Sequence, residues 1–307
     1  MKDFIEKVYK TLAFYQGEMM GAVRGLRFDA FSVETHDPVF VVGCSRAGTT
    51  LVYKTLSESR DLGSLHRETH DFWAQLHPPA ERQWASHEIP EELANDQDRR
   101  LVDKLFYTTT GKTRFVDKNN QNGLSIPYLR SLYPDAFFIY VKRHPGDNIH
   151  SLIEGWRRAD TFATWSDRLP AEVAIENGRF RRWCFFLAEG WRDYLTASIE
   201  EVCAFQYRKM NQAILAARQT VDPERWCEVR YESILDDPVE TFRGIFTHCR
   251  IPFDAHLERH CSQVLENPYN AFSTIGKEKW KSTGNRARIE KILPQVWPVA
   301  QAMGYRE

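Results

Sequence analysis

Short, uninterrupted apolar runs alternate along this chain with longer stretches in which apolar residues recur every three to four positions. Strands covered on both faces are apolar throughout, so the short runs are typical of buried parallel strands. They lie at 39–43, 114–118, 136–142 and 226–231. The longer periodicity predicts helices at 50–59, 93–106, 147–156, 180–217, 239–247, 255–265 and 286–303. This alternation predicts an α/β fold: a three-layer, doubly wound parallel sheet with helices on both faces.

Nothing along the chain marks a domain boundary, because no linker rich in Pro, Gly or Ser divides it. We therefore expect a single domain of 1–307, with an N-terminal helical arm at 1–36 and an α/β core at 37–307. The first residues carry charges throughout, so we expect neither a signal peptide nor a membrane span there. The periodicity of the arm favours an amphipathic packing helix over membrane contact; its apolar positions are Phe4, Ile5, Val8, Leu12 and Phe14.

Composition is that of an ordinary globular protein, with 42% hydrophobic and 27% charged residues among 307. The formal net charge of −1 argues against a general nucleic-acid or membrane binder, so any basic patch must be local. Six scattered cysteines without a CxxC pair favour reduced thiols and a cytoplasmic location.

The segment VVGCSRAGTTL, 41–51, follows the first predicted strand and is similar to a nucleotide-binding loop. Gly43, Gly48 and Thr50 have Walker A spacing, but Thr49 stands where the lysine would be and Arg46 lies in the middle. A glycine-rich turn that leads into a helix presents free N–H groups and the positive end of the helix dipole. In doubly wound sheets ligands bind beyond the carboxyl ends of the strands, so this turn predicts a phosphate site.

Other strand ends carry cations where a Mg²⁺-binding carboxylate would be expected. The run 136–142 leads into Arg143, and Asp117 is followed at once by Lys118. This pattern indicates an anionic ligand that is bound without a metal. In RHPGDNIHS, Arg143 precedes a predicted helix and Ser151 lies about one turn inside it. A guanidinium and a hydroxyl at this separation can converge on one phosphate, which predicts a second phosphate site.

These segments together resemble the sulfotransferases that use 3′-phosphoadenosine 5′-phosphosulfate (PAPS). GCSRAGTTL is similar to the family's 5′-phosphosulfate loop, G-x-x-R-S-G-T-T, with Ala47 in place of a serine. VKRHPGDNIHS is similar to its 3′-phosphate motif, an arginine with a serine eight positions on. VRYESILDDPVETFRGIF and KWKSTGNRARIEKILP…MGY resemble its later segments and its basic C-terminal loop and final helix. The resemblance runs from about Pro38 to the C-terminus and implies a P-loop-NTPase-like sulfotransferase fold.

The resemblance also implies which residues bind the donor. Arg46 would contact the 5′-phosphate and the bridging oxygen, and Arg143 and Ser151 would hold the 3′-phosphate. Tyr231 would contact the adenine, although a core aromatic fits the same position. A basic segment would close over the 3′-phosphate, although a solvated charge run has the same appearance; its residues are Lys279, Trp280 and Lys281. The loop residues implied in phosphate binding are Ser45, Arg46, Ala47, Gly48, Thr49 and Thr50.

Catalytic roles are implied for the second strand's end and for the segment SLHRETHDFW. Lys118 would approach the sulfuryl group, with Asp117 orienting it. Glu68 is the preferred general base, because some tyrosylprotein and heparan-type members carry a glutamate in similar segments; His66 and His70 remain alternatives. In the phenol and steroid branch the base is a histidine in a K-x-H-x-P segment, which here reads VDKNNQNG.

A metal site at His66, Glu68 and His70 is not predicted, because H-x-E-x-H is not the zinc-protease order and no third ligand is evident. His77 and His87 are expected in a solvated loop.

The sequence therefore predicts an enzyme that moves a sulfuryl group from PAPS to a hydroxyl or amine, releasing 3′-phosphoadenosine 5′-phosphate (PAP). The alternatives are a P-loop kinase with a degenerate loop and a non-catalytic module that binds PAP or another nucleotide. We expect a small-molecule, carbohydrate or glycolipid acceptor, with Glu68 favouring carbohydrate or peptide tyrosine only by analogy. No nucleic acid is expected as a partner, and a homodimer is left open.

Overall fold

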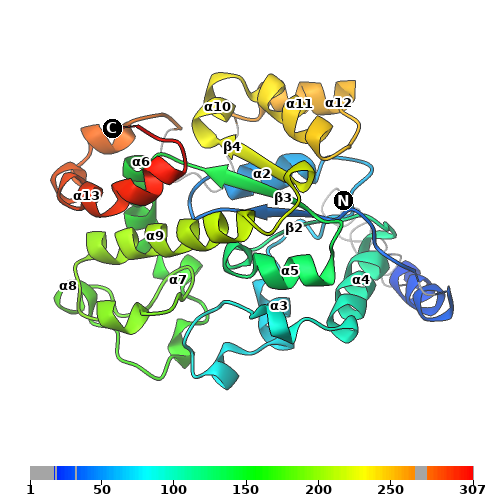
Figure 1. The fold of residues 1–307 in the computed structure, drawn as a ribbon, viewed down its shortest axis with the longest axis horizontal. Helices are drawn as coiled ribbons and strands as arrows, with labels where there is room; N and C mark the ends of the chain where they lie inside the picture. The colour runs from blue at the N-terminus through cyan, green and yellow to red at the C-terminus, as the bar shows by residue number, and fades with distance from the viewer. Residues whose placement is uncertain (1–16, 18, 32, 267–274, 307) are drawn as a thin grey trace, which may run out of the picture.

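The computed structural model describes residues 17, 19–31, 33–266 and 275–306. Its centre is a parallel sheet with strand order β2-β1-β3-β4 (Figure 1). The strands are β1 (Val39–Val42), β2 (Val116–Lys118), β3 (Phe137–Lys142) and β4 (Trp226–Arg230). In the register of the sheet Val41 lies opposite Lys118 on one side and Ile139 on the other. All four predicted strands are confirmed.

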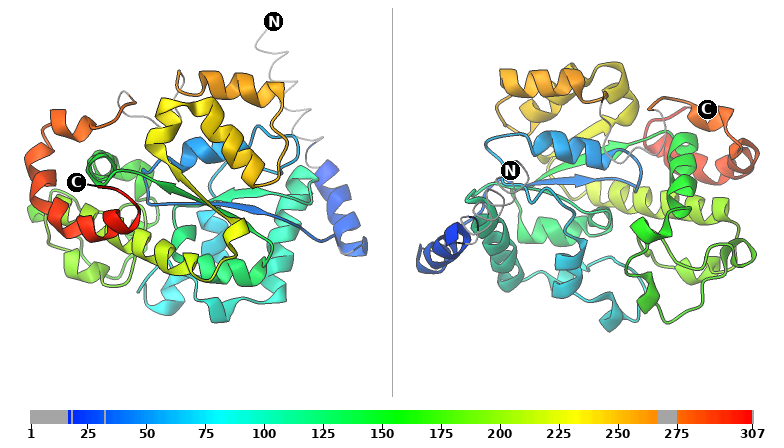
Figure 2. Two further views of the ribbon diagram at one scale, coloured as in Figure 1. Left: turned by 45° about the horizontal axis from the view of Figure 1, so that its top comes forward. Right: turned by 180° about the vertical axis from the view of Figure 1, so that it is seen from behind.

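Alternation of side chains along each strand divides the core into two layers, one on each face of the sheet. On one face Val41 and Ile139 pack with α2 (Thr49–Leu56), α11 (Pro238–His248) and α12 (Ala255–Gln263). On the other face Phe40 and Tyr140 pack with α4 (Asp96–Thr110), α5 (Ile126–Leu132) and α9 (Ile199–Arg218). Figures 1 and 2 show these helices on opposite sides of the strands. The predicted three-layer α/β architecture is confirmed.

The remaining elements connect these layers and surround the carboxyl ends of the strands. The helices are α3 (His70–Leu76), α6 (Pro145–Trp156), α7 (Ala159–Phe162), α8 (Ile175–Gly178), α10 (Tyr231–Asp236) and α13 (Arg286–Ala302). Short 3₁₀ turns include η1 (Pro79–Arg82), η2 (Glu91–Leu93), η5 (Trp191–Tyr194) and η7 (Lys279–Ser282). Helix α13 matches the predicted helix at 286–303.

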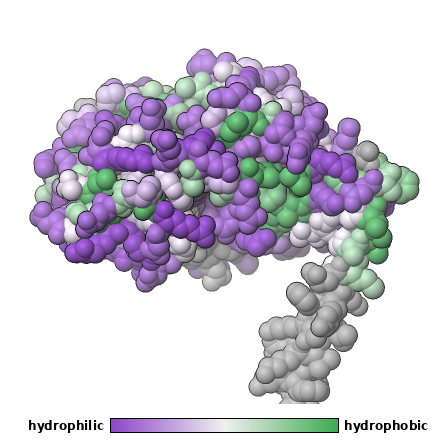
Figure 3. All heavy atoms as spheres, turned by 90° about the horizontal axis from the view of Figure 1, so that it is seen from below, coloured by the Kyte–Doolittle hydropathy of each residue, from purple (hydrophilic) through white to green (hydrophobic). Residues whose placement is uncertain are grey.

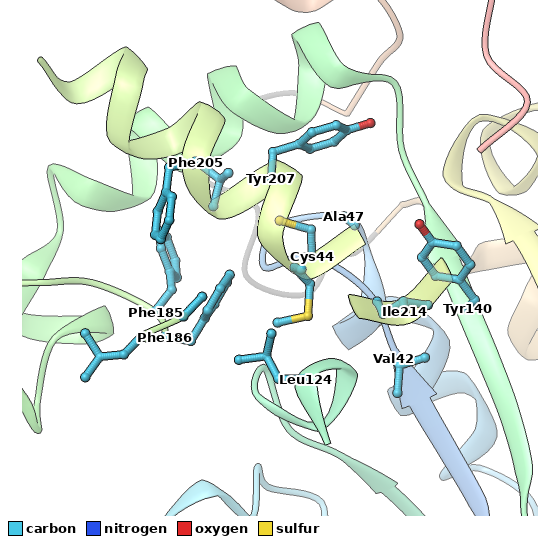
Figure 4. Packing of buried hydrophobic residues seen from close by; sticks show 14 of the residues in the cluster. Val42, Cys44, Ala47, Leu124, Tyr140, Phe185, Phe186, Phe205, Tyr207 and Ile214 are labelled. Atoms are coloured by element: carbon cyan, nitrogen blue, oxygen red, sulfur yellow. The ribbon is translucent and has the colours of Figure 1, made fainter. Parts of the chain in front are cut away.

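Of the long helix predicted at 180–217, only the part from residue 199 onward is helical. Helix α9 begins at Ile199, where the side chains of Ser198 and Glu201 form a capping box. The preceding stretch is irregular, and Phe185 has a left-handed backbone with φ 69°. Aromatic residues there are buried in the core (Figure 4), although they do not lie on a helix. Buried aromatic residues in a loop can imitate the spacing of an amphipathic helix, which explains the error.

Helical residues 19–31 pack against α4. Phe28 is 2% exposed, with its ring 6.1 Å from that of Tyr107, and Asp29 pairs with Arg100 and Lys104. Met19, Met20, Val23, Leu26 and Phe31 leave apolar side chains exposed in this segment, which contributes to the hydrophobic surface in Figure 3. The arm's predicted positions Phe4 to Phe14 lie outside the described residues. No helix in the described ranges is long and apolar enough to cross a bilayer.

Candidate active site

The loop between β1 and α2 is built for close packing. Gly48 caps α2 with φ 106°, a conformation that favours glycine. A Cβ added there would lie 2.3 Å from Cδ2 of Tyr231, so any side chain would collide with that ring. Asn148 on α6 donates from Nδ2 to the carbonyl oxygen of Ser45 at 2.9 Å, which fixes the loop to the helix that follows β3. The loop therefore holds its shape through contacts with two other strand ends.

Two predicted arginines meet beside this loop. Arg143 donates from Nη1 to the carbonyl oxygen of Arg46 at 2.9 Å, and its guanidinium lies over the Tyr231 ring at 4.5 Å. The Arg46 guanidinium lies over the ring of Phe162, 5.3 Å from its centre. Burial and the neighbouring charge of Arg143 lower the pKa of Arg46 to about 10. The two predicted phosphate sites thus share one cationic region.

A third cation reaches the same region from the C-terminal part of the chain. Lys279 begins η7, and burial together with the charge of Arg143 lowers the pKa of its ammonium group. Trp280 is buried, whereas Lys281 forms a surface ion pair with Glu278. Ser151 lies half-buried on α6. Of the predicted basic segment, Lys279 is the residue whose charge interacts with Arg143.

Buried polar atoms around the loop also indicate a ligand. Ser45 Oγ and Arg143 Nε are screened from solvent and have no hydrogen-bond partner among the residues that the structure describes. Leaving such a group unsatisfied costs about 1–3 kcal/mol. An anion with several oxygens can accept from both groups and from the loop, so the residues present fit a phosphate-bearing donor.

The predicted catalytic pair lies at the end of β2. Lys118 Nζ lies 2.5 Å from Glu68 Oε1 and 3.3 Å from Thr50 Oγ1. Burial alone would raise the pKa of Glu68, but the charge and hydrogen bond of Lys118, together with His70 and the Asn120 backbone, lower that pKa below its ordinary value. The charge of Glu68 in turn raises the pKa of Arg46. The carboxylate, the ammonium and the loop therefore belong to one electrostatic unit.

The two histidines near Glu68 differ in position. His70 begins α3, and its charge contributes to lowering the pKa of Glu68, which indicates proximity. Its Nε2 lies 3.4 Å from Asp71 Oδ1. His66 is exposed at φ 54°, and its carbonyl oxygen accepts from Lys54. The structure therefore brings His70, but not His66, into electrostatic contact with the predicted base.

Asp117 was expected to orient Lys118, and in the structure its carboxylate hydrogen-bonds to three other side chains. Asp117 accepts hydrogen bonds from Thr69 and Asn122 at 2.7 and 2.9 Å and from the Trp73 indole at 3.2 Å. Successive strand residues point to opposite faces, so Asp117 and Lys118 cannot share one side of β2. Burial raises the pKa of Asp117, although these hydrogen bonds oppose the rise. Asp117 instead anchors the segment that follows Glu68.

His77 and His87 are also not in a solvated loop. His77 Nε2 lies 2.7 Å from Asp98 Oδ2. His87 is 6% exposed and accepts from the backbone N–H of Leu187 at 2.9 Å, and burial lowers its pKa to about 3. The loop that carries them runs into the core, where each ring finds a polar partner.

Three supporting residues were not predicted. Phe162 lies under Arg46, and Asn148 fixes the loop, as described above. Asn120 donates its side-chain amide to the carbonyl oxygen of Phe185 at 3.1 Å, and its backbone N–H contributes to lowering the pKa of Glu68. Asn148 could have been suspected, because it lies inside the 143–151 motif. Phe162 and Asn120 give no local signal, since their roles depend on segments distant in sequence.

A cavity of about 440 Å³ adjoins this region between α6 and the start of α13. Arg157, Arg158 and Arg288 line it together with His150 and Glu154. Arg158 lowers the pKa of Arg46 through its charge, which places the cavity within electrostatic reach of the loop. Within the described ranges no three His, Cys, Asp or Glu side chains gather as a metal site would require.

A parallel sheet with a glycine-rich loop between β1 and α2 is the architecture of P-loop-like group-transfer proteins, and two arginines and a lysine–glutamate pair lie beside that loop. A family model described as "Sulfotransferase family" matches residues 38–183 and 165–255. The chain therefore belongs to the sulfotransferase family, enzymes that transfer sulfuryl groups, and the suspected resemblance is confirmed at that level.

Relatives and solved structures agree with this assignment. Omega-hydroxy-beta-dihydromenaquinone-9 sulfotransferase Stf3 of Mycobacterium bovis is 20% identical over 98% of this chain and 86% of its own length. The sulfotransferase domain of the Synechococcus PCC 7002 olefin synthase has a TM-score of 0.51 at 18% identity, covering 89% of this chain and 96% of that domain. Sulfotransferase STF9 of Mycobacterium avium has a TM-score of 0.52 at 14% identity, covering 87% and 81%. The two structures support the fold.

Proposed function

We propose that this protein transfers the sulfuryl group of PAPS to a hydroxyl or amine acceptor and releases PAP. The observation that carries the proposal is the convergence of Arg46, Arg143 and Lys279 on one region, where their charges and burial depress the pKa values of Arg46 and Lys279. Cations that repel one another in a buried setting are stabilised by an anionic ligand with two separated phosphates. PAPS has this charge distribution.

In this proposal the β1–α2 loop binds the 5′-phosphosulfate through its backbone N–H groups, Ser45, Arg46 and Thr49. Arg143, Ser151 and Lys279 hold the 3′-phosphate. Tyr231 is 9% exposed and packs between Gly48 and the Arg143 guanidinium. We therefore assign Tyr231 the orientation of Arg143 as its first role, and its contact with adenine remains a prediction.

The transfer step is an in-line displacement at sulfur. The acceptor oxygen forms the new O–S bond while the bond from sulfur to the bridging phosphate oxygen breaks, and that oxygen leaves with PAP. Glu68 takes the acceptor proton. Lys118 lies beside both Thr50 and Glu68, so its ammonium can stabilise negative charge on the sulfuryl oxygens. Arg46 stabilises the charge that develops on the leaving phosphate. No step in this scheme requires a metal.

Several classes of acceptor are compatible with the site, whereas PAPS is the single proposed donor. We propose a small hydroxylated molecule, a carbohydrate or a lipid, including glycolipids; the Mycobacterium bovis relative named for an omega-hydroxy menaquinone supports the lipid class. We also propose that the chain works as one catalytic domain in the cytoplasm. Six free thiols, five of them buried, fit such a reducing compartment.

Two measurements test the proposal. Calorimetric titration with PAP in the presence of EDTA should show binding, and ³⁵S-PAPS should label at least one member of an acceptor panel of sugars, phenols and hydroxylated lipids. A protein that binds ATP with Mg²⁺ and not PAP would instead be a degenerate kinase. A protein that binds PAP, sulfates no acceptor and does not hydrolyse PAPS would be a non-catalytic nucleotide-binding module.

A further inference from the structure

Asp147 is a buried carboxylate whose charge acts on Lys279 in the region that Lys279 shares with Arg143. It lies in the first turn of α6, four positions after Arg143, and is 2% exposed. Its Oδ2 accepts from the backbone N–H of Glu278 at 2.7 Å, and its Oδ1 accepts from the backbone N–H of Trp280 at 3.3 Å. Both oxygens are thus used to hold the backbone around Lys279, more than a hundred residues away along the chain.

The residues next to Asp147 are shaped for the same contact. A Cβ added to Gly146 would lie 2.4 Å from Nε1 of Trp280, so the indole can pack here only against a glycine. The ring of His144 is nearly parallel to the Trp280 ring, at 13° and a centroid distance of 6.4 Å. The start of α6 therefore holds the 278–282 turn through the carboxylate of Asp147, the backbone of Gly146 and the ring of His144.

This docking determines where a cation lies. Lys279 stands between the two backbone N–H groups that Asp147 holds, and its pKa is lowered by burial and by the charge of Arg143. Without the hydrogen bonds from Asp147, Lys279 would move away from Arg143, because the two cations repel each other. Their proximity needs a fastening that is stronger than this repulsion, and charge-assisted hydrogen bonds are suited to it.

We propose that Asp147 is a positioning residue for donor binding: it fastens the 278–282 turn to α6 so that Lys279 and Arg143 together face the 3′-phosphate. The inference rests on the proposed function. It makes a prediction opposite to that of simple electrostatics. A carboxylate in an anion pocket repels phosphate, so on charge alone its removal should tighten PAP binding. A fastening role requires its removal to weaken PAP binding.

The test compares two nucleotides on the full-length protein. PAP carries the 3′-phosphate and adenosine 5′-phosphate lacks it. We expect Asp147→Ala to raise the Kd of PAP by roughly tenfold or more, because two hydrogen bonds to a charged group are lost. We expect the Kd of adenosine 5′-phosphate to change by less than about twofold, since only the 3′-phosphate depends on the turn. Asp147→Asn, which keeps one acceptor oxygen, should give an intermediate loss of PAP affinity.

Controls separate fastening from general damage. Glu290→Gln removes an acidic group from a surface ion pair with Arg286 on α13 and should leave both Kd values unchanged. In a double-mutant cycle, Lys279→Ala should cost little further PAP affinity once Asp147 is alanine, because the two act together. If Asp147→Ala unfolds, Asp147→Asn carries the comparison.

Tighter or unchanged PAP binding in the Asp147 variants would overturn the inference, and so would an equal loss for both nucleotides. Additive losses in the double-mutant cycle would also overturn it. A wild-type protein that binds no PAP would refute the proposed donor itself, and the inference with it; this result is distinct from wild-type binding with the wrong pattern in the variants.

Discussion

Replacing Glu68 by glutamine preserves the shape of the side chain and removes the carboxylate proposed to accept the proton. Turnover should fall by about 10²–10⁴, the usual contribution of a general base. PAP affinity should change little, because the cationic groups around the loop remain. Glu68 is 33% exposed, so leaving Lys118 without its partner should cost less than the ~3–5 kcal/mol of a fully buried pair. The variant should therefore be folded, able to bind PAP, and slow.

The pH profile of the wild-type enzyme provides an independent check. Burial alone would raise the pKa of Glu68, but Lys118, His70 and the Asn120 backbone together more than offset that effect, so the pKa lies below the ordinary value of 4.5. A base is active when deprotonated, so its contribution is present above this pKa and is lost as the pH falls through it. We expect kcat/KM to stay nearly level from about pH 8 down to about pH 5.5. A histidine base would instead produce an acid limb near the ordinary histidine value of about 6.5.

Initial rates of PAP release, measured with saturating PAPS, give both the turnover of the Glu68→Gln variant and the kcat/KM of the wild-type enzyme at each pH. Glu81→Gln, at an exposed carboxylate in η1, is a matched control and should retain wild-type turnover. A Glu68→Gln enzyme that keeps more than about a tenth of wild-type turnover would refute the assignment of the base. His70→Gln would then be the next variant, because His70 is the histidine in electrostatic contact with Glu68.

Three further predictions concern the donor pocket and the N-terminal helix. Gly48→Ala should lower the free energy of unfolding by about 1–3 kcal/mol, because its Cβ would lie 2.3 Å from the Tyr231 ring at φ 106°; an unchanged melting temperature would contradict the loop geometry. Arg143→Lys should weaken PAP binding by roughly tenfold, since lysine keeps the charge but loses the planar guanidinium that lies on Tyr231; calorimetry showing wild-type affinity would disagree. Phe28→Ala should remove about 2 kcal/mol of packing between helical residues 19–31 and α4, so limited proteolysis near that helix should accelerate while turnover stays the same.

Much of the architecture could be predicted from the chain itself, because strand and helix periodicities are local properties. The four apolar runs became the four strands, and the loop and 143–151 segments lie at strand ends as parallel-sheet topology requires. The wrong helix prediction at 180–198 has the same origin. Periodicity reports which residues are buried, and a buried irregular segment that ends at the Ser198 cap can have nearly the same pattern as a helix.

In the candidate site, too, some features could be predicted from local sequence and others could not. The loop glycines, Arg46, Arg143 and the Glu68 and Lys118 candidates are recognisable from residue type and spacing, because each stands next to a strand end or inside a short motif. The partners of these residues were decided only by the tertiary structure: Asp117 turns to the opposite face of β2, His66 stays at the surface, and Asp147 reaches backbone groups near the C-terminus. A side chain's partner depends on which distant segment packs beside it, and that information exists only once the sheet and its helices have assembled.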